Sequence, residues 1–76
     1  MTESYGKYVK IVAESFEKLK DKGKIAKEVD SRLLARMLIA LHNGILMSMM
    51  QGLDQKDAVL MFEIGVSNIL QYAIHG

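Results

Sequence analysis

The feature that most constrains this chain is a segment, residues 33–50, that is apolar on nearly every side. Its only polar side chains are Arg36, His42, Asn43 and Ser48. At about 100° per residue, apolar side chains cover one face of a helix here and recur on the opposite face. A helix that is apolar nearly all round must be buried nearly all round. We therefore expect this helix to have packing partners on two sides.

A transmembrane helix is the main alternative for this segment, which is at the lower edge of spanning length. Arg36, His42 and Asn43 lie inside it, however, and a charge near the centre of a membrane span costs several kcal/mol on insertion scales. We therefore interpret the segment as a core helix and expect no membrane association. The chain has no cysteine and a polar, charged start without a signal-peptide pattern, so we expect a cytoplasmic protein.

Hydrophobic periodicity and glycine positions predict three helices, and no proline interrupts them. The predicted helices span about residues 4–22, 31–51 and 55–74. Gly23 and Gly52 follow the first two helices as natural C-terminal caps. Asp30 and Asp54 are predicted N-caps, and Asp57 at the third position of the last helix completes an acidic variant of the capping box.

The connection between the second and third helices is too short for any arrangement except an antiparallel hairpin. The third helix has a main apolar face and a second, partial one at Leu60 and Ile64. Such a hairpin and its twofold mate close into a four-helix bundle. We predict an all-α fold, one domain over residues 1–76, whose last two helices form this bundle in a homodimer. The predicted dimer interface comprises Ile39, Asn43, Met47, Met50, Leu60, Ile64, Ser67 and Gln71.

Size and composition also favour association. A chain of 76 residues leaves much of its surface exposed, and half of these residues are hydrophobic. Without cysteines there is no disulfide or thiolate metal site, and His42 and His75 are too far apart for a local metal motif. The net charge of +1 argues against a dedicated nucleic-acid surface. A partner chain is the expected means of covering the remaining apolar surface.

No pattern typical of catalysis, of a phosphate loop or of a metal site is present, so we expect neither an enzyme nor a cofactor. Candidate ligand-binding residues are His42, Phe16 and Met49. The His42 imidazole could bind a small molecule, or it could contact a backbone carbonyl or lie exposed at a groove. The methionines suit a plastic core or dimer interface, or a promiscuous pocket. Asn43 either pairs across a dimer or lies exposed beside Arg36.

Three short motifs lead from the end of the first helix into the second. They are Leu19-x-x-x-Gly23-Lys24-Ile25, Val29-Asp30-x-x-Leu33-Leu34-Ala35 and Leu38-Ile39-Ala40-Leu41-x-x-Gly44-Ile45. Together they resemble the C-terminal half of TetR-family transcriptional regulators, over about residues 4–75. The resemblance implies that the last two helices build a dimeric four-helix bundle and that the chain lines part of a site for a small hydrophobic effector.

The family's N-terminal helix-turn-helix has no counterpart in these 76 residues, so the resemblance implies DNA binding only through a domain absent from this chain. Our first hypothesis is a dimerisation and partial effector-binding module of a TetR-like transcriptional regulator. The alternative is a stand-alone helical protein–protein interaction module whose apolar groove binds a partner helix. A membrane-associated helical peptide is a third, weaker hypothesis.

Overall fold

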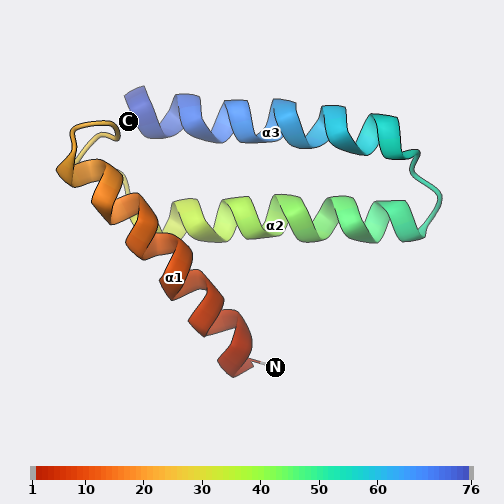
Figure 1. The fold of residues 1–76 in the computed structure, drawn as a ribbon, viewed down its shortest axis with the longest axis horizontal. Helices are drawn as coiled ribbons and strands as arrows, with labels where there is room; N and C mark the ends of the chain where they lie inside the picture. The colour runs from red at the N-terminus through yellow and green to blue at the C-terminus, as the bar shows by residue number, and fades with distance from the viewer. Residues whose placement is uncertain (1, 76) are drawn as a thin grey trace.

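The computed structural model describes residues 2–75 and contains three helices and no strand within that range (Figure 1). The helices are α1 (Thr2–Asp21), α2 (Ser31–Met50) and α3 (Gln55–His75). The all-α prediction is therefore confirmed, and each observed helix boundary lies within two residues of the predicted one, which is the usual scatter at helix ends.

The end of α1 is closed by Gly23, which has a positive φ of 74°. The Gly23 amide donates to the Lys20 carbonyl, and the Lys24 amide donates to the Leu19 carbonyl, both at 2.9 Å. This pattern satisfies the last carbonyls of the helix, and glycine adopts the required left-handed conformation without steric cost. The predicted C-terminal cap at Gly23 is confirmed.

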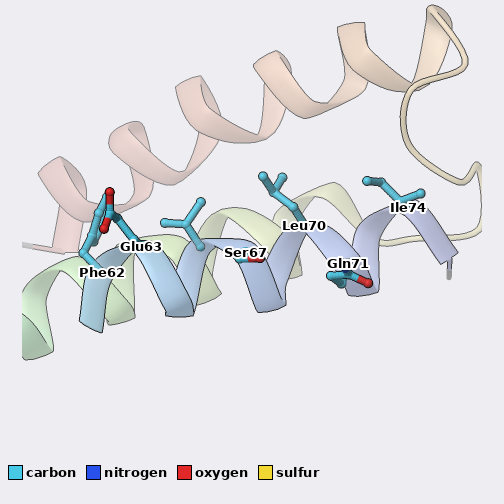
Figure 2. Close-up of a pocket in the computed structure, with 7 residues that line it drawn as sticks. Phe62, Glu63, Ser67, Leu70, Gln71 and Ile74 are labelled. Atoms are coloured by element: carbon cyan, nitrogen blue, oxygen red, sulfur yellow. The ribbon is translucent and has the colours of Figure 1, made fainter. Parts of the chain in front are cut away.

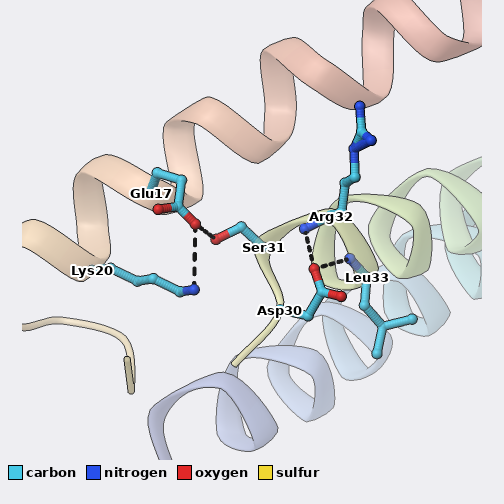
Figure 3. Close-up of polar contacts among 6 residues, drawn as sticks. All are labelled: Glu17, Lys20, Asp30, Ser31, Arg32 and Leu33. Atoms are coloured by element: carbon cyan, nitrogen blue, oxygen red, sulfur yellow. Dashed lines mark hydrogen bonds and ion pairs between the residues drawn. The ribbon is translucent and has the colours of Figure 1, made fainter. Parts of the chain in front are cut away.

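The connector from α1 to α2 is held in place by two buried side chains and a backbone hydrogen bond to α3. Ile25 and Val29 are buried, and the Ala26 amide donates to the Ala73 carbonyl near the end of α3 at 3.0 Å. Asp30 caps α2, since its carboxylate accepts from the amides of Arg32 and Leu33 at 2.9 and 3.3 Å (Figure 3). The N-cap predicted at Asp30 is therefore confirmed.

Helices α2 and α3 lie side by side and antiparallel, joined by a tight turn (Figure 1). Gly52 in that turn has a φ of 110°, and the Leu53 amide donates to the Ser48 carbonyl at 2.9 Å. Asp54 directly precedes α3, as expected. Within residues 2–75, however, Asp54 forms a hydrogen bond only through its backbone carbonyl, which accepts from the Ala58 amide. Its side chain does not form the cap that the sequence predicts.

The core lies at one end of the hairpin. Helix α2 packs against both α1 and α3, while α1 crosses the N-terminal half of α2 (Figure 1). The buried core residues come from all three helices and the connector: Val9, Phe16, Ile25, Val29, Leu34, Ala35, Ile39, Ile69 and Ala73. Along its three principal axes the chain measures 40 × 29 × 14 Å. A molecule this flat has two broad faces and little interior.

Candidate protein–protein interface

Large apolar side chains are exposed along most of the hairpin. In α2, Met47 and Met50 are 60% and 83% exposed, and in α3 Ile64 is 54% exposed. The other exposed large apolar residues of the hairpin are Leu33, Leu46, Met49, Val59, Leu60, Met61, Leu70, Tyr72 and Ile74. Single exposed apolar residues are common on proteins, but a set of this size on two neighbouring helices indicates an interaction surface.

The accessible surface of the chain measures how much remains uncovered. A compact monomer of 76 residues is expected to expose about 4,700 Å². This chain exposes 5770 Å². The excess of about 1,100 Å² is comparable to the roughly 800 Å² that each partner buries in a standard protein–protein interface. One partner of ordinary interface size would cover most of this excess.

One side of α2 is left open by both neighbouring helices. Ala35 and Ile39 are buried in the core that includes the α1 residues Val9 and Phe16, and Leu41 contacts α3. At 100° per residue, the sector that faces away from both contacts forms a stripe with steps of four and three residues. We call this stripe the open face of α2; its residues are Leu33, Met37, Ala40, Gly44 and Met47. All five are exposed except Met37, which is half-buried.

The open face of α2 carries no charged side chain, and Arg36 lies at its margin. On α3, Met61 and Ile64 are exposed and lie in the sector that continues this surface across the hairpin. Alternate steps of four and three residues are the spacing that helices use when they pack along a common seam. The surface can therefore accept one or two further helices.

The predicted interface residues differ in their exposure to solvent. Seven of the eight are exposed: Asn43, Met47, Met50, Leu60, Ile64, Ser67 and Gln71. Ile39 needs a correction, because it is only 4% exposed and belongs to the core of the chain itself. Helix α1 crosses α2 at that point, and periodicity along α2 alone could not locate this crossing. Ile39 is therefore unavailable to a partner while α1 is docked.

The candidate ligand-binding residues do not come together. His42 and Met49 line an open groove of about 460 Å³ between the ends of α2 and α3 near the turn. Phe16 is instead buried in the core, 7% exposed, and does not line this groove, so its inclusion in a ligand site is corrected. The aromatic residue in the groove is Phe62, whose ring meets the His42 imidazole edge-on, with centroids 6.2 Å apart. Phe62 is recognised as a groove residue only once α2 and α3 are paired in the hairpin.

A second groove, of about 480 Å³, runs along the C-terminal half of α3 (Figure 2). Leu70 and Ile74 point toward the side on which α1 lies, and Gln71 points the other way (Figure 2). Ser67 and Gln71 therefore lie on the outer edge of α3. This edge is more polar than the surface formed by Met61 and Ile64.

A polar cluster fastens α1 to the start of α2 (Figure 3). The buried Ser31 hydroxyl donates to the Glu17 carboxylate, and the Lys20 ammonium lies 3.3 Å from the same carboxylate oxygen. The hydrogen bond from Ser31, followed by that from Lys20, lowers the pKa of Glu17 below its ordinary value of 4.5. Because its members satisfy one another, we interpret the cluster as a structural contact.

Within residues 2–75, no group of three His, Cys, Asp or Glu side chains is placed to hold a metal ion. Helices α2 and α3 are both long and apolar enough to cross a membrane, by length and composition alone. One or two such helices are weak evidence of a membrane span, since mostly buried core helices pass the same test; here 22% of the apolar stretch of α2 and 11% of that of α3 are buried. The arrangement is best suited to binding apolar surfaces.

No protein-family model, curated protein or solved structure matches this chain. The resemblance to TetR-family regulators therefore rests on the three short motifs around the first connection and on the helical hairpin.

Proposed function

We propose that this chain is the dimerisation and partial effector-binding module of a TetR-like transcriptional regulator. The observation that carries the proposal is the exposed apolar surface of the hairpin, in a chain whose total accessible surface exceeds that of a compact monomer by about 1,100 Å². A second copy of the chain offers the same apolar surface, so two hairpins can cover one another in a four-helix bundle.

The family resemblance adds what such a dimer would do. Each subunit would connect to a DNA-binding domain that this chain does not contain, and the bundle would act as the hub between the two. A ligand that binds one arrangement of the subunits more tightly shifts the population toward it and so changes the spacing of the DNA-binding domains. In this scheme the present residues contact no DNA.

The groove near the turn is the place where the chain would contribute to an effector site. His42, Met49 and Phe62 supply a polar atom, a flexible thioether and an aromatic edge on a largely apolar lining. The groove is open on one side, so this chain supplies only part of the enclosure that a small hydrophobic effector needs. The rest would come from preceding helices or from the second subunit.

Light scattering during gel filtration tests the dimer directly. At micromolar concentration we expect twice the mass of the chain, and a clean monomer would overturn the dimerisation proposal. The reading frame immediately upstream of Met1 in the genome tests the regulatory part, because a TetR-like regulator requires a helix-turn-helix there. A dimer without an upstream helix-turn-helix would leave a dimerisation module that is not a regulator.

A stand-alone interaction module is the second candidate, and the elongated groove along α3 favours it. An amphipathic partner helix could lie in such a groove with apolar residues at every third or fourth position. A chain that is monomeric alone and forms a one-to-one complex with an amphipathic helical peptide would support this candidate over the homodimer.

A further inference from the structure

No contact within residues 2–75 explains why a glycine stands at position 44, in the middle of α2. Glycine weakens a helix interior relative to alanine, so an interior glycine usually marks a close approach of another group. Gly65 in α3 fits that expectation, since a Cβ there would lie 2.7 Å from two carbons of Leu41. At Gly44, by contrast, a Cβ would meet nothing within 4 Å. No group of the described residues therefore occupies the space beside Gly44, which leaves the α2 backbone open to close approach by another chain.

Gly44 is also near the centre of the open face of α2. Ala40 precedes it on the same stripe and Met47 follows it, and all three are exposed. Because Leu41 pairs with Gly65 in the antiparallel hairpin, Gly44 lies at about the level of residues 61 and 62 of α3. The exposed Met61 and Ile64 side chains thus flank the same region of the hairpin. A partner helix lying along the stripe would come closest to the backbone at Gly44.

From these observations we infer that two copies of the chain pack α2 against α2, with the twofold axis passing close to Gly44. This inference rests on the proposed dimerisation and names the seam within it. In a twofold interface a residue near the axis meets its own counterpart, so a charge there would face a like charge. The open face of α2 has no charged side chain, and Arg36 is two turns from Gly44 at the margin.

The excess accessible area supports a second copy of the chain as the partner that covers the open face of α2. Packing α2 on α2 brings Met61 and Ile64 of each subunit beside the partner's α2, which buries the surfaces of both helices together. Helix axes in such contacts lie about 8–10 Å apart, and the smallest residues allow the shorter distances. A standard dimer buries roughly 800 Å² per partner, which is most of the excess of about 1,100 Å² that this chain exposes.

Disulfide trapping tests the seam, because the chain contains no cysteine of its own. In the Gly44→Cys variant the two thiols would lie close to the axis, and a disulfide requires Cα atoms about 4.4–6.8 Å apart. We expect a covalent dimer on mild oxidation of this variant. Gly6→Cys is the matched control, since Gly6 is an equally open helical glycine but lies on α1. It should form little covalent dimer at the same protein concentration.

A second pair of variants tests the close approach by equilibrium measurement. Gly44→Leu should raise the dimer dissociation constant about ten- to a hundredfold, as overpacking a close contact does. Gly6→Leu should leave it unchanged. Circular dichroism of both variants checks that the helices still form. If Gly44→Leu loses its helices, the cross-linking of Gly44→Cys decides the question.

The outcomes separate the seam from the dimer. A monomeric wild-type chain overturns both. Suppose that the wild-type chain dimerises, that Gly44→Leu dimerises with the same dissociation constant and that Gly44→Cys fails to cross-link. These results together overturn only the α2 seam. Efficient cross-linking of Ile64→Cys with none at Gly44→Cys would move the axis to α3.

Discussion

Leu41 packs directly onto the backbone of Gly65, so that a Cβ at position 65 would lie 2.7 Å from both δ carbons of the leucine. This contact is one of those by which α2 and α3 pack together within the hairpin. It shows that Leu41 and Gly65 face the neighbouring helix. The surface proposed for dimerisation lies on residues of the two helices that face away from such contacts.

Substituting Gly65 tests the contact. Relative to the Gly6→Ala control, Gly65→Ala should cost up to about 1 kcal/mol, because both changes gain helix propensity but only the first meets a neighbour, the terminal carbons of the half-buried Leu41 side chain, which must shift. Urea unfolding at one protein concentration measures the difference. Combining Gly65→Ala with Leu41→Ala should remove most of the clash, so the effects of the two changes should be non-additive. Equal free-energy changes at positions 65 and 6 would contradict the close approach.

Asp30 and Asp54 provide a matched pair for helix capping. Asp30→Ala should cost about 1 kcal/mol of unfolding free energy, because two amides of α2 lose their hydrogen-bond acceptor. Asp54→Ala should cost clearly less, since Asp54 accepts the Ala58 amide through its backbone carbonyl, which alanine also has. Thermal unfolding of both variants compares them. A larger loss at Asp54 would show that its carboxylate caps α3 in solution.

A charge placed on the proposed interface should separate the subunits. Ile64→Lys should raise the dimer dissociation constant by at least about tenfold, since burying an unpaired ammonium is costly. Ile11→Lys is the control, because Ile11 is 58% exposed, close to the value for Ile64, but lies on α1. Light scattering over a dilution series gives both constants. An unchanged dimer with Ile64→Lys would exclude this part of α3 from the interface.

The contact between Glu17 and Ser31 predicts a pH dependence. Because the pKa of Glu17 is lower in the folded chain than its ordinary value of 4.5, the contact stabilises the fold above that value. The stabilisation is lost as the pH falls through the lower, folded pKa. Between about pH 6 and pH 3 the melting temperature of the wild type should therefore fall more than that of Glu17→Gln. Ser31→Ala should reduce the same dependence, and identical pH profiles would contradict it.

Local patterns predicted most of the helical structure because their causes are local. The left-handed residue after α1 requires a glycine, and the first amides of α2 require the Asp30 carboxylate. Asp54 shows the limit of such reasoning. It has the same place before a helix, yet within residues 2–75 its side chain does not cap α3, since a suitable residue type does not fix the side-chain conformation.

The candidate site was only partly predictable for a different reason. Periodicity identifies which residues share a face of a helix, but not which neighbour covers that face. Ile39 and Phe16 have the periodicity of packing residues, and the crossing of α1 over α2 buries both in one core. Phe62 joins His42 only because the hairpin brings their helices together.

The sequence by itself determined that this chain is three helices with more apolar surface than they can cover. That result follows from composition, periodicity and short connections, which act within one helix or between neighbours in sequence. Only the tertiary structure decided where the uncovered surface lies. Docking α1 on one side of α2 and α3 on another leaves the stripe around Gly44 open, because a helix can be covered only in the directions from which its neighbours approach.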